Sequence, residues 1–175
     1  MKLFFTISLL VVFADGSKAQ QLFIENFDSA TLNELWQIIA GNWQRADVQD
    51  LKIAPAENGR QFVLRSDSAG LIRLFIDLPL NAKGKMLQLS FSYYTYAKGI
   101  APQVETGFYK KQIKDGIRGK PARSALPVKG MWISHTRTFT VPADANQFRV
   151  IFSNPRSSPT GKVACFDVVS VSLLK

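Results

Sequence analysis

Cysteine and histidine are almost absent from this sequence. Its 175 residues include one cysteine, Cys165, and one histidine, His135. A single cysteine excludes an internal disulfide framework and a cysteine-rich zinc site. A single histidine excludes multi-histidine metal centres and leaves little for a serine–histidine–aspartate hydrolase. We expect Cys165 to be a buried, inert thiol and His135 to lie on the surface of a strand.

Long hydrophobic runs are also missing, with one exception at the start of the chain. The run from Leu3 to Phe13 has about eleven residues, too few for a helix that spans a bilayer. It follows Lys2 and precedes Ser17-Lys18-Ala19, a pattern typical of a signal peptide cleaved after Ala19. We therefore expect residues 1–19 to direct export to the periplasm or the medium. The alternative is that this run is a buried strand.

Residues 20–175 then form the mature protein, which we expect to be a single domain. The whole chain carries 22 Lys and Arg against 13 Asp and Glu, with 46% hydrophobic residues. Removing two lysines and one aspartate with the signal peptide leaves 20 basic and 12 acidic residues, a net charge of +8. This composition excludes a disordered chain and allows one domain with a substantial core.

Short alternating stretches rich in Val, Ile, Phe and Tyr predict an all-β domain. The expected strands are residues 21–26, 42–47, 61–66, 71–78, 86–96, 104–110, 131–141, 147–154 and 163–174. Turn residues separate them at Asn58-Gly59, 82–84, 142–144 and 155–161. Residues 32–39 fit either a short helix or a strand. Nine or so short strands favour a single antiparallel β-sandwich or barrel.

Two of these strands alternate clearly enough to assign their faces. Between residues 71 and 78, one face is apolar, and the other carries Arg73, Phe75 and Asp77. Between residues 87 and 96, an apolar face alternates with small polar residues that lead to Tyr94 and Tyr96. We expect the apolar faces to form the core. The other faces could support the flat apolar side of a ligand ring.

Two blocks of sequence resemble a known family. The first is FDSATLNELWQIIAGNW, and the second runs from Trp132 through FTVPAD to FDVVSV near the end of the chain. Together they resemble the jelly-roll carbohydrate-binding modules, of galactose-binding-like type, that accompany secreted bacterial polysaccharide-degrading enzymes. The opening block is also similar to concanavalin-like laminin-G-type sandwiches. The resemblance implies a jelly-roll β-sandwich that binds a polysaccharide or oligosaccharide, with Trp36 and Trp43 in its core.

The resemblance also implies one structural calcium ion. Family members often bind it between the first strand and an aspartate of the last strand, and the matching residues here are Glu25, Asp28 and Asp167. Three carboxylates with backbone carbonyls could supply the oxygen ligands that calcium needs. The sequence departs from the family signature at Val168, where a second aspartate is usual. The alternative is that Asp28 caps a turn and Asp167 binds local backbone amides.

Sugar binding requires aromatic faces together with side chains that hydrogen bond to hydroxyl groups. The candidate ligand-binding residues are Tyr94, Tyr96, Tyr109, Arg73, Arg149, Trp132 and Lys110. Residues 111–130 read as a mobile loop with six basic residues against Asp115, a net charge of +5. Such a loop would suit an acidic polysaccharide, although it could also be a solvated segment. A tyrosine on an outer face could equally well pack under a loop.

Other functions have weaker support in the sequence. Nucleic acid is not expected as a partner, because the chain reads as exported and lacks a nucleic-acid-binding motif. A polysaccharide lyase is disfavoured because its motifs match poorly, and a glycosidase would need two carboxylates, such as Glu105 and Asp77, about 5 to 10 Å apart. We therefore expect a non-catalytic carbohydrate-binding domain. The alternatives are a structural or protein-interaction domain of the cell envelope, and a small lyase or glycosidase.

Overall fold

A computed structural model describes residues 19–29, 31–54, 62–66, 68–96, 99–110, 117–154 and 164–175. Nearly all of the expected signal peptide, the turn at Asn58-Gly59 and the turn at 155–161 lie outside the described residues. Within the described part of the chain, no helix is long and apolar enough to cross a membrane.

The described residues form β-strands joined by turns, with one short 3-10 turn, η1 (Leu80–Ala82). The strands are β1 (Gln20–Glu25), β2 (Trp36–Ala40), β3 (Trp43–Asp47), β4 (Phe62–Ser66), β5 (Gly70–Asp77), β6 (Met86–Thr95), β7 (Gln103–Tyr109), β8 (Ile117–Ala125), β9 (Trp132–Thr140), β10 (Gln147–Asn154) and β11 (Ala164–Leu173). All nine predicted strands are present, each within two residues of its predicted ends.

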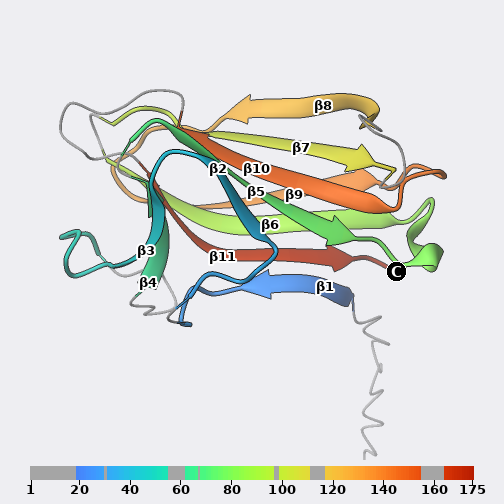
Figure 1. Cartoon of the computed structure of the whole chain (residues 1–175), viewed down its shortest axis with the longest axis horizontal. Helices are drawn as coiled ribbons and strands as arrows, with labels where there is room; N and C mark the ends of the chain where they lie inside the picture. The colour runs from blue at the N-terminus through green and yellow to red at the C-terminus, as the bar shows by residue number, and fades with distance from the viewer. Residues whose placement is uncertain are drawn as a thin grey trace, which may run out of the picture.

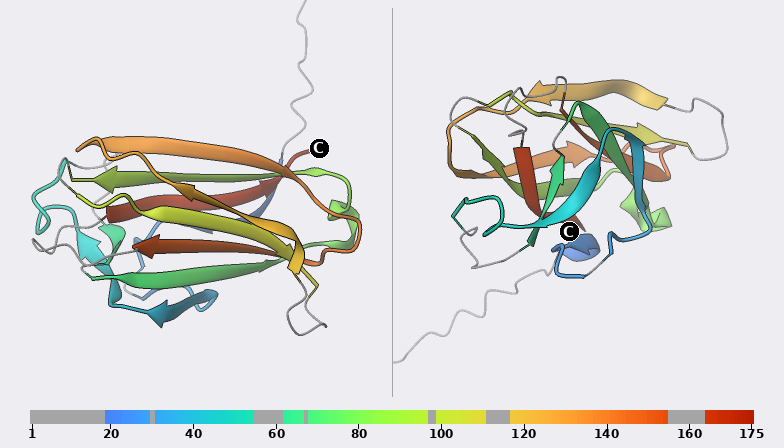
Figure 2. Two further views of the ribbon diagram at one scale, coloured as in Figure 1. Left: turned by 90° about the horizontal axis from the view of Figure 1, so that it is seen from above. Right: turned by 60° about the vertical axis from the view of Figure 1, so that its left-hand side comes forward.

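The strands make two antiparallel sheets that pack face to face (Figure 1). Sheet A has the order β3–β4–β11–β6–β9, and β1 also pairs with β11, beside the part of that strand that β4 leaves uncovered. Sheet B has the order β2–β5–β10–β7–β8. The chain passes repeatedly from one sheet to the other, and the two further views in Figure 2 show the layers. This is the predicted all-β, antiparallel sandwich of jelly-roll type.

Aromatic rings fill the space between the sheets. Phe152 of sheet B stacks on Phe166 of sheet A with ring centroids 4.3 Å apart, and Phe91 meets Phe152 at 5.0 Å. Burying one such side chain contributes roughly 1.5–3 kcal/mol to stability. Trp36 and Trp43 are 7% and 3% exposed, which confirms that they belong to the core.

The predicted face assignments are also confirmed. The apolar side chains of the two readable strands are all buried: Ile72, Leu74, Ile76, Leu78, Leu87, Leu89, Phe91 and Tyr93. Their alternating neighbours on β5 and β6 therefore point to the outer faces of the sandwich. The sandwich thus has a core and two outer faces, one on each sheet.

The structure settles one alternative that the sequence left open and corrects one expectation. Residues 36–40, left open between helix and strand, form β2 at the edge of sheet B. Residues 117–125, expected to lie in a mobile loop, form β8, which pairs with β7. Gly119 and Pro121 hide this strand in the sequence. Both are tolerated because β8 lies at a sheet edge and the β7–β8 register shifts between Thr106 and Phe108.

His135 does not lie on the outer surface as expected. It is on β9, an edge strand of sheet A, and its ring packs against Phe91 with centroids 4.8 Å apart. Its Nε2 atom is buried and has no hydrogen-bond partner among the described residues. Burial lowers the pKa of His135, and the nearby Arg137 lowers it further. The difference arises because alternation along β9 directs the His135 side chain towards the core.

This arrangement predicts a pH-dependent stability. Because the folded state depresses the pKa of His135, the unfolded chain binds the proton more readily, and stability should fall as the pH drops below the ordinary value of about 6.5. We expect the free energy of unfolding to decrease less between pH 7.5 and pH 5 in His135→Gln than in the parent protein. Urea unfolding across this range measures the difference. Parallel pH profiles for the two proteins would contradict the prediction.

Candidate functional site

Charged and aromatic side chains gather on the outer face of sheet B. Directly opposed residues of neighbouring antiparallel strands lie side by side, so the register sets cross-strand rows on this face. The first row is Gln37, Arg73, Ile151, Glu105 and Arg123; the second is Phe75, Arg149 and Gly107; the third is Asp77, Gln147 and Tyr109. All five strands of the sheet therefore contribute to one surface.

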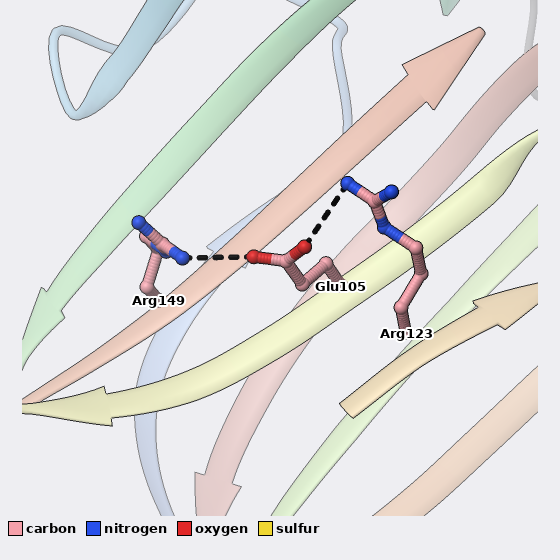
Figure 3. Close-up of polar contacts among 3 residues, drawn as sticks. All are labelled: Glu105, Arg123 and Arg149. Atoms are coloured by element: carbon pink, nitrogen blue, oxygen red, sulfur yellow. Dashed lines mark hydrogen bonds and ion pairs between the residues drawn. The ribbon is translucent and has the colours of Figure 1, made fainter. Parts of the chain in front are cut away.

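Glu105 on β7 lies between two arginines, as Figure 3 shows. Its Oε1 atom accepts a hydrogen bond from Nη2 of Arg149 at 2.8 Å, and its Oε2 atom lies 3.2 Å from Nη2 of Arg123. The Glu105 and Arg149 side chains are each 16% exposed, whereas that of Arg123 is 59% exposed. The charge-assisted bond to Arg149 is thus the better protected of the two.

Arg149 also lies over an aromatic ring. Its guanidinium carbon is 4.4 Å from the centroid of Tyr109, a favourable cation–π arrangement. Gly107 makes room for this, because a Cβ atom there would lie 3.3 Å from Cε2 of Tyr109. The Tyr109 hydroxyl is buried and has no hydrogen-bond partner among the described residues. Burial raises the pKa of Tyr109, and Arg149 partly opposes the rise. Tyr109 is therefore a neutral, buried ring that supports Arg149 at neutral pH.

Phe75 continues the aromatic surface. It meets Tyr109 edge-on with ring centroids 6.0 Å apart, and the guanidinium carbon of Arg73 lies 5.2 Å from its centroid. Arg73 in turn donates a hydrogen bond from Nε to Oε1 of Gln37 at 2.9 Å. We call Arg73, Phe75, Glu105, Tyr109, Arg123 and Arg149 the arginine–aromatic sector. It combines ring surfaces with guanidinium donors that are held in place by their neighbours.

Three of the seven predicted ligand-binding residues belong to this sector: Tyr109, Arg73 and Arg149. A fourth, Lys110, follows Tyr109 directly at the end of β7. The sequence analysis placed Phe75 on the outer face but did not name it as a ligand-binding residue, and it did not place Glu105 or Arg123 on this face. Its alternation with Arg73 and Asp77 was the signal that could have added Phe75 to the candidate ligand-binding residues. The register of β8 that places Arg123 beside Glu105 carries no recognisable sequence signal.

The other three predicted ligand-binding residues lie on the opposite side of the molecule, on sheet A. Tyr94 meets Tyr96 and Trp132 edge-on, with ring centroids 5.2 and 5.6 Å away. Trp132 donates a hydrogen bond from Nε1 to the carbonyl oxygen of Ala54 at 2.7 Å. The three rings pack against a small second core formed by Val48, Ile53, Val63 and Cys165. Their contacts are those of side chains that pack under the loop that follows β3.

Cys165 lies beneath these rings. Its side chain is 1% exposed, and burial raises the pKa of the thiol to about 12. Burial likewise raises the pKa of Tyr96 to about 12, with a further contribution from Cys165. The thiol stays protonated at physiological pH, which agrees with the expected inert cysteine.

Two of the three expected calcium ligands, Glu25 and Asp167, accept hydrogen bonds from backbone N–H groups. The carboxylate of Glu25 accepts backbone N–H groups from Phe27 at 3.0 Å and Asn33 at 3.3 Å, and Asp167 accepts the N–H of Val168 at 2.8 Å. Among the described residues, no three His, Cys, Asp or Glu side chains could together hold a metal ion. The calcium site implied by the resemblance therefore stays a prediction, with two of its three carboxylates already bound to backbone amides.

A guanidinium group occupies the carbonyls that a metal could have used. Arg45 on β3 donates from Nε to the carbonyl oxygen of Phe27 at 2.7 Å and from Nη2 to that of Asp28 at 3.4 Å. Its guanidinium carbon lies 3.2 Å from the ring centroid of Phe62. Phe27 has a positive φ of 57°, so the bend after β1 needs support. Glu25 provides that support by accepting the N–H of Phe27, and Arg45 provides it by donating to the carbonyl of the same residue.

The ion pairs of Glu105 should differ in their contribution to stability. Glu105→Gln removes the charged acceptor of both arginines, including the mostly buried Arg149, and we expect a loss of about 1–3 kcal/mol in the free energy of unfolding. Arg123→Ala breaks only the exposed pair and should cost less than about 1 kcal/mol. Urea unfolding of both variants tests this. Equal losses would show that the buried pair with Arg149 adds nothing beyond the exposed pair and would contradict the prediction.

The support given by Arg45 leads to a second prediction. Arg45→Ala should lower the free energy of unfolding by about 1–3 kcal/mol, because two backbone carbonyls and the Phe62 contact lose their partner. The melting temperature of the parent protein should be the same in EDTA and in millimolar calcium chloride. A clear rise with calcium would support the calcium ion expected from the sequence and contradict our interpretation of this region.

No protein-family model and no curated protein matches the sequence. The fold is similar to several solved structures. The CBM22-1 xylan-binding domain of Paenibacillus barcinonensis Xyn10C is 11% identical, with a TM-score of 0.58 over 90% of this chain and 96% of that one. The K1 cleaved adhesin domain of Lys-gingipain from Porphyromonas gingivalis W83 is 13% identical, with a TM-score of 0.56 over 86% and 96%.

A third similar structure belongs to a much longer protein. The enzymatically active domain of bacteriophage CBA120 tailspike protein 4 is 15% identical with a TM-score of 0.59, but the match covers 81% of this chain and only 20% of that one. At these identities the likeness establishes the fold alone. The chain thus has the jelly-roll β-sandwich fold that is also found in carbohydrate-binding modules.

Proposed function

We propose that this protein is a non-catalytic carbohydrate-binding domain that holds a polysaccharide on the outer face of sheet B. The observation that carries the proposal is the arginine–aromatic sector. Phe75 offers the edge and face of a ring to the C–H side of a sugar, and Arg73 and Arg149 beside it carry donors for hydroxyl or carboxylate oxygens. The fold shared with xylan-binding and adhesin domains supports this proposal.

The same sector favours an acidic polysaccharide. Its three arginines outnumber its one carboxylate, Glu105, so a net positive charge remains after the ion pairs are counted. A uronate or sulfate group on the polymer would be attracted, and its arrival accelerated, by this charge. Export by the expected signal peptide is part of the proposal, because a polysaccharide ligand would be met outside the cytoplasm.

The geometry argues against a glycosidase on this face. Glu105 and Asp77 are two strands apart, and their partners on β10, Ile151 and Gln147, are four residues apart. Standard sheet spacings then put their Cα atoms about 17 Å apart, well beyond the 5–10 Å of carboxylate pairs in such enzymes. The sequence left this distance open. Glu105 is also bound by two arginines, which ties up both of its oxygens.

Variants on the two outer faces test the proposal. The purified protein would be run through native gels that contain xylan, galactan, alginate or polygalacturonate, at low and high salt. Arg73→Ala combined with Phe75→Ala on sheet B should weaken retardation at least about tenfold, equivalent to about 1.4 kcal/mol. For an acidic polymer, retardation should also fade as salt rises.

Tyr94→Ala combined with Tyr96→Ala on sheet A is the matched control. It should leave retardation unchanged, provided that thermal melting shows the variant to be folded. The reverse result would move recognition to the tyrosines of sheet A. Absence of retardation by every polymer would refute carbohydrate binding and favour a protein-interaction domain of the cell envelope.

A further inference from the structure

A cavity adjoins the arginine–aromatic sector at the end of the sheet B face. It has a volume of about 460 Å³, and its borders include Phe75, Asp77, Gln147, Gln37, Glu34 and Leu35. This volume lies within the usual range for sites that bind small ligands. None of the residues predicted from the sequence to bind ligand borders this cavity.

The walls of the cavity are fixed by local contacts. On one side, Gln147 of β10 donates a hydrogen bond from Nε2 to Oδ1 of Asp77 on β5 at 2.9 Å. On the other side, Asn33 holds the turn before β2: its side-chain oxygen accepts the N–H of Leu35 at 3.0 Å, and its carbonyl oxygen accepts that of Trp36 at 2.9 Å. The cavity is therefore preformed, which limits the entropy lost on binding.

The charge of the cavity is opposite to that of the neighbouring sector. Its charged border residues are the two carboxylates of Glu34 and Asp77, and its other polar borders are the amides of Gln37 and Gln147. Carboxylates accept hydrogen bonds from hydroxyl groups and repel other carboxylates. An uncharged, hydroxyl-rich sugar ring is compatible with these carboxylates and amides, whereas a uronate is not.

Phe75 borders both regions. It belongs to the arginine–aromatic sector through Arg73 and Tyr109, and it also lines the cavity. Along β5 the order of outward residues is Arg73, Phe75, Asp77, and alternate residues of a strand are about 7 Å apart. One polymer chain crossing this face would thus meet a cation, an aromatic ring and an anion in sequence.

We propose that the cavity is a subsite for an uncharged pyranose unit of the bound polysaccharide. The C–H face of the ring rests against Phe75, and its hydroxyl groups donate hydrogen bonds to Asp77 and Glu34. The adjoining arginine–aromatic sector binds the next unit of the chain, which is where a negative charge is accepted. This inference rests on the proposed function and refines its ligand to a polysaccharide with at least one neutral unit.

The test uses carboxylate-to-amide substitutions that preserve size. Dissociation constants for the full chain would be measured from the retardation of the protein in native gels that contain xylan, galactan or polygalacturonate. Asp77→Asn combined with Glu34→Gln should weaken binding of a retained neutral polymer by about tenfold or more. The same double variant should bind polygalacturonate at least as tightly as the parent protein, because two repulsive charges are removed.

Asp50→Asn is the matched control, since Asp50 is an exposed carboxylate in the loop after β3, which is a strand of sheet A. It should change neither constant. Suppose that the protein binds a neutral polymer and that this binding depends on Arg73. If the cavity variant then behaves like the Asp50→Asn control, the subsite is refuted and the proposed function stands. If the protein binds polygalacturonate but no neutral polymer, the subsite is also refuted. If the protein binds none of the polymers, both the subsite and the proposed function are overturned.

Discussion

Burial of aromatic rings between two sheets is the interaction on which the rest of this structure depends. With one cysteine, held in its thiol form beneath the rings of sheet A, no disulfide within the chain can contribute. The contact of Phe152 with Phe166, and the rings around it, join the two layers. Because this burial uses one side of every central strand, the other side is released for chemistry. Both outer faces are therefore consequences of the same packing.

Much of the fold could be predicted because alternation is a strong signal in long central strands. The strands 70–77 and 86–95 have one continuous apolar face, and their inward residues were assigned correctly. The edge strands gave weaker signals. β2 has Ile38 and Ile39 exposed, so its hydrophobic residues do not alternate with burial, and β8 contains both glycine and proline. At the edges of a sheet, the hydrophobic pattern of a strand therefore does not match its burial.

The site was predicted only in part, for a related reason. Alternation shows which side chains point away from the core, but it does not show on which of the two outer faces they lie. Tyr94 and Tyr109 both point outward, yet one lies on sheet A under a loop and the other on sheet B beside Arg149. Deciding between the faces requires the order of strands, which depends on long-range pairing. Phe75, Glu105 and Arg123 come together only through that pairing.

The proline in β8 has a consequence for how this face meets its surroundings. An edge strand presents unpaired backbone groups on which a further strand can assemble. Pro121 lacks an N–H group, and the register shift nearby twists the strand away from regular pairing. These features discourage the growth of sheet B by addition of a neighbouring molecule. The edge of sheet B beside Arg123 is thereby less available to a further β-strand, whatever lies on its outer face.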